Sequence, residues 1–382
     1  KMSGVNVAYD SITSIAYSGV VGGMVIYVAD DPGVSAGMCE QDTRMFALMS
    51  DLPLLDAASV EDAYRLVQAG FEISERVGTP VFVRLVTSIS SSFAAVDVDE
   101  DTLPRQDRPA QLIRDIDRFT KAGSLICMAQ HRDVIKRLGL AGDAAREMGL
   151  NTLALSSKPG GVGIVACGVV AAYLDEAFEL AAKHSFNREP VSLLTLTAVH
   201  PFPAVEAREL LAHCDTVLVL EELEPIVERG FYVEAQKTGW QGRILGKEGG
   251  TAGGGLYERV GEYGLRHIFA GLNAALPELR LPDELVSGHA GADTLAAARP
   301  ITVCAGCPHR GVFMGINTAV RKAGYKKDEV MVTGDIGCTI LGMNPPFNTV
   351  WNEVSMGASI PLAQGYVHAG VKTPVIATIG DS

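Results

Sequence analysis

Apolar residues along the first hundred positions follow first a strand-like and then a helix-like spacing. Two apolar runs, GGMVIYVAD (residues 22–30) and PVFVRLVTS (residues 80–88), have the length and β-branched content of buried strands. Between them, residues 59–78 carry apolar side chains at helical spacing, with Ser59 at the start and Gly78 at the end. This order of strand, helix and strand predicts a parallel sheet, whose strands usually present ligand-binding residues at their carboxyl ends.

The middle of the chain repeats the α/β pattern. Residues 161–184 predict a strand, a turn at Gly168 and a helix, and two further apolar runs, residues 191–203 and 215–223, predict strands. A glycine-rich stretch, residues 246–261, predicts a loop followed by a helix. These elements form a second α/β block.

Two further features divide the chain. The acidic, proline-containing residues 96–110 predict a linker between the first two blocks. A third α/β block begins near Pro300 and ends with an apolar strand at residues 374–379. The pattern of hydrophobic and polar positions thus predicts an α/β protein throughout.

Composition narrows the class of protein. With 382 residues, of which 47% are hydrophobic and 20% charged, the chain can form two or three globular domains. The net charge of -13 argues against a nucleic-acid partner. The chain has no signal-peptide pattern and no apolar run that would span a bilayer, and its seven scattered cysteines suit a reducing compartment. We expect a cytoplasmic location and no membrane partner.

The last residues of the chain place a glycine and an aspartate at the tip of an apolar strand. A carboxylate there suits a divalent cation such as Mg²⁺, which takes oxygen ligands and shares them with phosphates. The alternative is that Gly380 and Asp381 only cap the next element. Residues 334–342 (GDIGCTILG) and 356–360 (MGASI) add small residues where backbone amides can approach an anion.

A polar loop, residues 29–44 (ADDPGVSAGMCEQDTR), follows the first predicted strand. Functional loops gather at the carboxyl ends of such strands, so this loop is predicted to shape the entrance of an active site. Simple solvation and capping of the loop is the alternative. The residues concerned are Asp30, Asp31, Ser35, Glu40, Gln41, Asp42 and Arg44.

Several stretches in this order form a recognisable set: GVNVAYDSITSIAYSGVVGGMVIYVADDPG and EQDTR in the first block, VHPFP and VLVLEELEP in the second, and CAGCPHRGVF, GDIGCTILGMNPPF, MGASIPLAQG and ATIGDS in the third. Together they resemble the thiamine-diphosphate-dependent 2-oxoacid:ferredoxin oxidoreductases, most closely the alpha subunits of the indolepyruvate type. The resemblance covers nearly the whole chain.

The resemblance implies three consecutive parallel-sheet α/β domains of the thiamine-diphosphate-binding type, the first and last incomplete. Residues 1–108 would be the C-terminal part of a pyrimidine-binding (PYR) domain and residues 109–152 a helical connection. Residues 153–290 would form a transketolase C-terminal-like domain, and residues 291–382 the N-terminal part of a diphosphate-binding (PP) domain. The chain would then be the middle of a longer polypeptide and inactive by itself.

The segments outside this middle part would carry the remaining machinery. The resemblance implies a glutamate upstream of Lys1 that activates the cofactor, and a second metal ligand and two iron–sulfur modules downstream of Ser382. Within the chain, Asp381 is expected to bind Mg²⁺. The expected cofactor-binding residues are Cys304, Cys307, His309, Arg310, Asp335, Gly337, Cys338, Met356, Gly357, Ser359, Gly380 and Asp381.

The three cysteines of the third block allow two interpretations. Cys304, Cys307 and Cys338 resemble the start of a four-thiolate [4Fe-4S] site, whose fourth ligand would lie outside the chain. Alternatively, the loop is scaffolding of the cofactor pocket, and His309 and Arg310 are available for a phosphate or a carboxylate.

Other conspicuous residues are expected to be structural. His200 in VHPFP lies in the transketolase C-terminal-like block and is assigned an architectural role. Cys127, Cys167 and Cys214 lie among apolar residues and are expected to be small buried hydrophobes, and Cys39 is expected to be incidental.

The function implied is the oxidative decarboxylation of an arylpyruvate such as indolepyruvate to an acyl-coenzyme A, with electrons passing through iron–sulfur clusters to ferredoxin. A smaller beta subunit, ferredoxin, coenzyme A and the 2-oxoacid would be the partners, in a heterotetramer. Three alternatives remain open: another 2-oxoacid specificity, a non-redox thiamine-dependent decarboxylase, and a non-catalytic assembly subunit.

Overall fold

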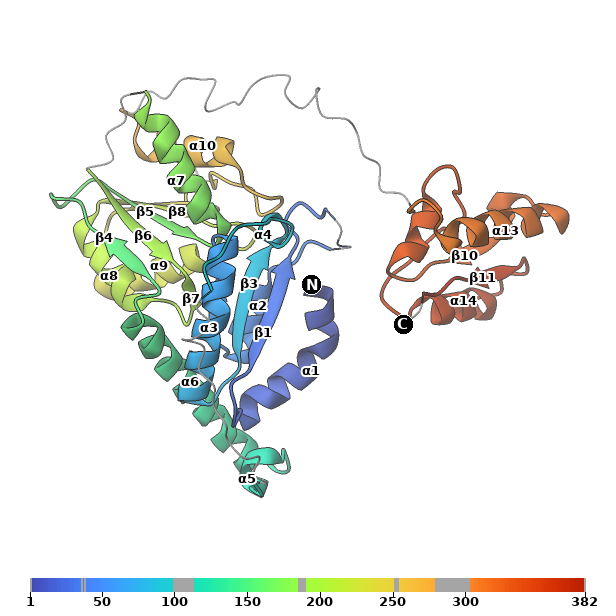
Figure 1. Ribbon diagram of the computed structural model, residues 1–382, viewed down its shortest axis with the longest axis horizontal. Helices are drawn as coiled ribbons and strands as arrows, with labels where there is room; N and C mark the ends of the chain where they lie inside the picture. Colours follow the sequence, from blue (N-terminus) through green and yellow to red (C-terminus); the bar gives the residue numbers. More distant parts are fainter. Residues whose placement is uncertain are drawn as a thin grey trace. The chain divides into compact units, whose positions relative to one another are not determined.

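The computed structural model describes residues 2–35, 37, 39–98, 113–184, 190–250, 254–278 and 303–380. The chain divides into two compact units, unit 1 (Lys1–Ala290) and unit 2 (Gly291–Ser382) (Figure 1). From residue 99 onward, the predicted linker at residues 96–110 lies outside the described residues. None of the described helices is both long and apolar enough to cross a membrane.

Unit 1 contains two sheets (Figure 1). The first has the strand order β1 (Val25–Asp30), β3 (Val81–Val86), β2 (Leu54–Asp56) and β7 (Ala198–His200). The second has the order β4 (Thr152–Ala154), β6 (Val191–Leu196), β5 (Val162–Cys167), β8 (Thr216–Leu220) and β9 (Arg243–Leu245). Neighbouring strands are parallel except in the pairs β2–β7 and β4–β6. The predicted α/β class with mostly parallel sheets is confirmed.

Ten helices complete the described part of unit 1: α1 (Met2–Ser18), α2 (Thr43–Ser50), α3 (Val60–Val77), α4 (Thr87–Ser90), α5 (Ile116–Phe119), α6 (Ser124–Glu147), α7 (Val169–Ala182), α8 (Ala204–His213), α9 (Ile226–Thr238) and α10 (Leu265–Ala275). Nine of them contribute to two apolar layers, one with α3, α4, α6, α7 and α10 and the other with α1, α2, α8 and α9. Successive strand residues enter opposite layers, as Val81 and Phe82 do. The strands are therefore continuously apolar because both of their faces are covered.

The predicted helix at residues 59–78 is confirmed in detail. The Ser59 hydroxyl accepts a hydrogen bond from the amide of Asp62 at 3.1 Å, as an N-cap does. Gly78 ends the helix in the left-handed region, with φ of +70°. The two strands predicted around it are also present, as β1 and β3.

The strand predicted at residues 191–203 is wrong in its extent, because the chain changes sheets at Thr197. The amides of Thr197 and Ala198 donate to Asn151 Oδ1, and the Thr197 carbonyl accepts from the amide of Asp56. These bonds replace the ladder of β6. The next residues form β7, in which His200 pairs with Leu54 of the first sheet. The second block thus contributes a strand to the sheet of the first.

The expected burial of the cysteines is confirmed for two of the three. Cys167 and Cys214 are buried in an apolar layer. The prediction for Cys127 is wrong: it is half-buried, and its Sγ lies 3.6 Å from the carbonyl of Lys121. Cys127 is in the first turn of α6, where Leu125 is exposed, so this end of the helix extends past the core.

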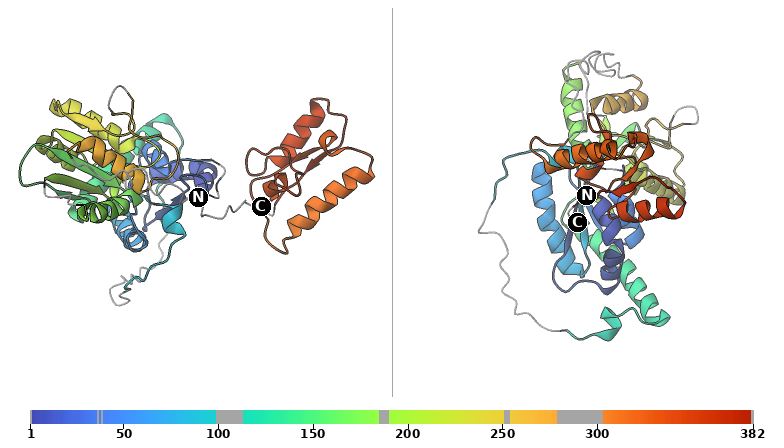
Figure 2. Two further views of the ribbon diagram at one scale, coloured as in Figure 1. Left: turned by 90° about the horizontal axis from the view of Figure 1, so that it is seen from above. Right: turned by 90° about the vertical axis from the view of Figure 1, so that its right-hand side faces the viewer.

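Unit 2 contains α13 (Pro308–Lys322), η1 (Lys327–Glu329), β10 (Met331–Thr333), η2 (Cys338–Met343), α14 (Ser359–His368) and β11 (Val375–Ala377). The strands β10 and β11 are a parallel pair, and α13 and α14 flank them (Figures 1 and 2). Phe313 and Val320 of α13 pack against Val332 of β10 in a small core. Unit 2 is therefore a second α/β unit with an apolar core of its own.

The carboxyl ends of the two sheets of unit 1 are joined by a set of buried charges, which we call the junction network: Asp30, Asp42, Arg44, Asp56, Arg84, Glu221 and Glu222. Arg84 of β3 holds the ends of its two neighbouring strands. Its Nε donates to Asp30 Oδ2 at 2.6 Å, and its Nη1 donates to both oxygens of Asp56 at 2.9 and 3.0 Å.

Arg44 of α2 connects the first sheet to the second. Its guanidinium donates to both carboxylate oxygens of Asp42 and, through Nη1, to Glu221 Oε2 at 2.7 Å. Its Nη2 also donates to the carbonyls of Glu222 and Glu224, at 2.5 and 2.9 Å. Glu221 follows β8 and accepts the amides of residues 226–228, which begin α9. One arginine thus fixes the segment after β8 against the first sheet.

The junction network has more carboxyl groups than guanidinium groups. Burial favours the uncharged acids and raises the pKa of Asp56 and of Glu221 despite their arginine partners. Burial also raises the pKa of Glu222 to about 7, against the lowering effect of the Tyr263 amide bonded to its Oε1. For Asp42, burial is outweighed by Arg44 and Arg84, and its pKa is lowered. The excess of acidic over basic groups thus goes with raised carboxyl pKa values, and Glu222 titrates near neutral pH.

Replacing Arg44 by alanine is expected to lower the free energy of unfolding by about 3–5 kcal/mol, because it leaves the buried carboxylates of Asp42 and Glu221 without their cation. Urea unfolding of the chain measures this. Arg65→Ala is the control, since Arg65 forms an exposed pair with Asp62 whose loss costs about 0–1 kcal/mol. An Arg44→Ala variant as stable as the control would contradict the role of the network.

Replacing Glu222 by glutamine is expected to remove a pH dependence of stability. The carboxyl has an ordinary pKa of 4.5 when unfolded and about 7 when folded, so the folded state loses stability as pH rises through this window. Relative to the unmodified chain, Glu222→Gln should gain about 3 kcal/mol in unfolding free energy between about pH 4 and pH 8. The exposed Glu209→Gln is the matched control. Parallel pH profiles for the chain and Glu222→Gln would rule the titration out.

Candidate functional site

The segment that follows β10 in unit 2 is folded around Asp335. Its carboxylate is buried, and Oδ1 accepts hydrogen bonds from the amides of Ile336 and Gly357, both at 2.8 Å. The Thr339 hydroxyl donates to the Asp335 carbonyl at 2.6 Å. Asp335 therefore ties the end of β10 to the turn before α14, which brings together two of the segments in which the sequence predicts a cofactor site.

Three hydroxyl groups fix the carboxyl ends of the strands beside Asp335. The Thr333 Oγ1 donates to the Ser359 carbonyl at 2.8 Å, and the Ser359 Oγ donates to the Thr333 carbonyl at 3.0 Å. The Thr378 hydroxyl, after β11, donates to the same Thr333 carbonyl at 2.9 Å. Ser359 is fully buried, so it positions α14 and does not face an open site.

Glycines expose the backbone at this edge of unit 2. Gly337 has φ of +127° and Gly357 has φ of +80°, conformations that residues with a Cβ rarely adopt. A side chain built at either position would meet no atom within 4 Å. Gly380, after β11, is likewise open. The three predicted glycines thus leave the main chain accessible, which fits the close approach of a phosphate group.

Two acids and an amide lie at the same edge. Burial raises the pKa of Glu353, and the neighbouring Asp335 raises it further. Among the described residues, Glu353 Oε2 and Asn352 Oδ1 are buried atoms without a hydrogen-bond partner. This edge therefore offers oxygen acceptors. Asp381, the predicted Mg²⁺ ligand, lies outside the described residues, so its placement stays a prediction.

The three cysteines of unit 2 differ in their exposure to solvent. Cys304 and Cys338 are exposed and Cys307 is half-buried. In the part of the chain that the structure describes, no group of three or more His, Cys, Asp or Glu side chains is placed to hold a metal ion. Because the fourth ligand of the expected [4Fe-4S] site would lie outside the chain, the cluster at Cys304, Cys307 and Cys338 stays a prediction.

The remaining predicted residues of unit 2 lie around the start of α13 and before α14. The His309 Nδ1 is 3.3 Å from the Cys307 Sγ, and the exposed Arg310 donates to the carbonyl of Val303. Met356 is exposed, next to Gly357. Their roles in binding a cofactor stay predictions.

The polar loop after β1 has an unexpected environment. Asp30, Asp42 and Arg44 belong to the junction network and are buried. Asp31 is buried as well, and its carboxylate accepts hydrogen bonds from the amides of Ser35 and Gly37 and from hydroxyl groups. The acids at the start and end of the loop therefore hold the loop in place.

Residues in the centre of the loop accept hydrogen bonds from α1 and from the segment before α10. Glu40 Oε1 accepts from the amides of Gly33 and Gly261, at 2.6 and 2.8 Å, and so links the loop to the segment before α10. Gln41 accepts from Asn6 of α1. These contacts define the loop's conformation, and the entrance role of its residues stays a prediction.

Sequence reasoning missed several buried charges. Arg84, Glu221 and Glu222 were not selected, although an arginine inside an apolar strand and two glutamates at the end of another are visible signals. Lys247 was also missed: its Nζ donates to the Tyr263 hydroxyl at 2.8 Å, and burial lowers its pKa to about 8. Because Lys247 lies in a glycine-rich stretch that predicts a loop, its burial could not be expected from the sequence.

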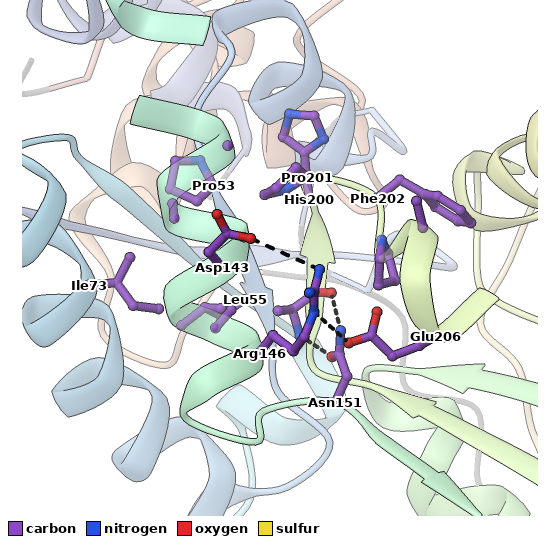
Figure 3. A pocket seen from close by; sticks show the side chains of 17 residues that line it. Pro53, Leu55, Ile73, Asp143, Arg146, Asn151, His200, Pro201, Phe202 and Glu206 are labelled. Carbon is purple, nitrogen blue, oxygen red and sulfur yellow. Dashed lines mark hydrogen bonds and ion pairs between the residues drawn. The ribbon is translucent and has the colours of Figure 1, made fainter. Parts of the chain in front are cut away.

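A small cavity of about 160 Å³ lies between α6, β2, β7 and α8 (Figure 3). Arg146 of α6 crosses one side of it, with its Nε 3.5 Å from Glu206. His200 lines the cavity, and burial lowers its pKa to about 4, so the imidazole is neutral. A neutral histidine paired within a sheet agrees with the architectural role expected for it.

In comparisons with known proteins, the chain is similar to subunits of indolepyruvate oxidoreductase. The chain is 32% identical over 387 residues to the indolepyruvate oxidoreductase subunit IorA of Methanothermobacter thermautotrophicus, covering all of this chain and 58% of that protein. It is 31% identical over 373 residues to the IorA subunit of Pyrococcus abyssi, covering 96% of this chain and 54% of that one. The chain thus spans a little over half the length of these relatives.

The other comparisons add little. No family model matches the chain. A solved 2-oxoglutarate:ferredoxin oxidoreductase from Magnetococcus marinus aligns with a TM-score of 0.46 and 15% identity, over 60% of this chain and 46% of that one, which is too weak to carry an argument. The sequence similarity, in contrast, extends along the whole chain. The chain is therefore homologous to the IorA subunits of indolepyruvate oxidoreductase.

Proposed function

We propose that this chain is the catalytic core of a thiamine-diphosphate-dependent subunit that oxidatively decarboxylates arylpyruvates such as indolepyruvate to acyl-coenzyme A. Ferredoxin would receive the electrons, and a smaller beta subunit would complete a cytoplasmic heterotetramer. The observation that carries this proposal is the 32% identity to an IorA subunit along the entire chain. Because the chain spans a little over half of these relatives, the proposed activity is that of a subunit of the relatives' length.

The proposal includes the domain assignment made from the sequence. The sheet with β1 and β3 would be the pyrimidine-binding domain, and the sheet with β5 and β8 the transketolase C-terminal-like domain. Unit 2 would supply the diphosphate-binding domain. Support comes from the α/β architecture of each part and from the order of the matching motifs in the sequence.

The proposed diphosphate site is the edge of unit 2 around Asp335. Gly337 and Gly357 would bring accessible backbone to the phosphates, and Asp335 would keep the Gly357 turn in position through its 2.8 Å hydrogen bond. Asp381 would hold Mg²⁺. When bound, thiamine diphosphate supplies a carbanion for attack on the 2-oxoacid and an electron sink for the loss of CO₂.

The proposal predicts the activity of the complete gene product with its beta subunit, assayed without oxygen. Viologen dye reduction should require coenzyme A and an arylpyruvate, and Asp381→Ala should lower the rate by more than about 100-fold because the metal site is lost. Dye reduction by pyruvate or 2-oxoglutarate alone would change the substrate assignment. A preparation that contains thiamine diphosphate and iron but reduces no dye with any 2-oxoacid would exclude the oxidoreductase, and release of an aldehyde would then identify a decarboxylase.

Binding of the cofactor offers a second prediction. Gly357→Ala puts a Cβ into a left-handed turn, a strain of about 1–2 kcal/mol. Relief of this strain moves the free turn out of the conformation that the cofactor requires, so thiamine diphosphate binding should weaken by roughly tenfold. Gly365→Ala is the matched control, because Gly365 lies within α14 with open space around it. Calorimetric titration of the complete subunit with the cofactor and Mg²⁺ measures both. Equal affinities for the two variants would place the cofactor elsewhere.

A further inference from the structure

An exposed apolar stripe runs along one side of α6. Its members Leu125, Met128 and Ile135 are 83%, 53% and 54% exposed. Their spacing of three and seven residues places them on one side of the helix. The residues of α6 that pack into the core lie on the other side: Gln130, Val134, Arg137, Ala141, Ala144 and Ala145. The stripe therefore faces away from the core of unit 1.

The stripe begins on the part of α6 that projects from unit 1. The helix reaches beyond both sheets, and α5 lies at its tip (Figures 1 and 2). Ile116 and Phe119 of α5 are also exposed, at 59% and 40%. Single exposed apolar residues are common on soluble proteins, but a row of them on one helix marks a surface that binds another molecule.

The stripe has the spacing of a coiled-coil seam. Steps of three and four residues alternate along one row of α6, which we call the α6 seam: Leu125, Met128, Arg132, Ile135 and Gly139. A side chain built at Gly139 would meet no atom within 4 Å, so a neighbouring backbone can approach this position closely. A seam of this width accommodates one helix, whereas binding to a lipid surface requires a broader apolar face.

The charges of the α6 seam and its border are positive. Arg132 lies within the seam and Lys136 next to it, and both are exposed. Among the described residues, neither forms an ion pair. Asp133 is the only acid between residues 124 and 140, and its carboxylate accepts a hydrogen bond from Arg137 Nε at 2.8 Å. Because the chain as a whole has a net charge of -13, this stretch is a local exception that suits an acidic partner and repels a second α6.

We propose that the α6 seam binds an amphipathic helix of a partner polypeptide, with an apolar stripe bordered by acidic residues. The apolar stripe of the partner packs on Leu125, Met128 and Ile135, and its carboxylates pair with Arg132 and Lys136. The apolar contact supplies most of the affinity, and the charge pairs select the partner helix and its orientation. This surface is independent of the proposed thiamine chemistry.

The test uses the complete subunit and a fluorescein-labelled synthetic peptide with leucine at the seam positions of each heptad and glutamate at the bordering positions. Fluorescence anisotropy should show saturable binding that weakens as the salt concentration rises. Met128→Glu combined with Ile135→Glu should weaken binding by more than about tenfold, because it puts two carboxylates into the apolar row. Arg132→Glu combined with Lys136→Glu should also weaken it, and that variant should instead bind a peptide with lysine in place of glutamate.

Val233→Glu is the matched control, because Val233 is 52% exposed on another helix, α9. Far-UV circular dichroism and urea unfolding establish that each variant folds. Absence of saturable binding of the acidic peptide, or equal binding by all variants, would overturn the proposal. Self-association of the unmodified subunit that Met128→Glu abolishes would also overturn it, since a second copy would then occupy the seam. Binding to anionic lipid vesicles in preference to the peptide would do the same. None of these results depends on whether the subunit oxidises a 2-oxoacid.

Discussion

The burial of two guanidinium groups between two sheets determines how unit 1 is built. Arg84 gathers the ends of three neighbouring strands, and Arg44 connects them to the segment after β8. A buried charge is tolerated only when its partners are close and well oriented, so these arginines specify where each carboxylate must lie. The carboxyl ends of the strands, which many α/β proteins use for ligands, here hold the two sheets of unit 1 together.

The carboxyl ends of the strands in unit 2 are stabilised in a different way. Its strand ends are fixed by neutral hydroxyl groups and by one carboxylate, Asp335, whose oxygen accepts backbone amides. The neighbouring glycines leave the main chain open, and acceptor atoms of Asn352 and Glu353 lack partners among the described residues. A strand edge with accessible backbone and few fixed charges remains free to bind a ligand, which is why the proposed cofactor site is there.

Local signals in the sequence predicted the elements well. The helix α3 follows from its Ser59 cap and Gly78 terminus, and the buried strands follow from their apolar runs. The sheet change at Thr197 could not be predicted, because it depends on Asn151, a partner 46 residues away. The same holds for Arg44 and Glu221, which are 177 residues apart in the chain. The polar loop after β1 was expected to shape an active-site entrance, whereas Asp30, Asp42 and Arg44 of this loop are buried. Polar residues in a sequence do not by themselves show whether they face solvent or form a buried network.

The proposed function requires that the complete subunit binds thiamine diphosphate through a metal and the open backbone of unit 2. The most direct test is calorimetric titration of that subunit with thiamine diphosphate in the presence and absence of Mg²⁺. We expect saturable binding that requires Mg²⁺ and is lost when thiamine, which lacks the phosphates, replaces the cofactor. A folded subunit that binds thiamine as well as its diphosphate, or binds neither, would contradict it.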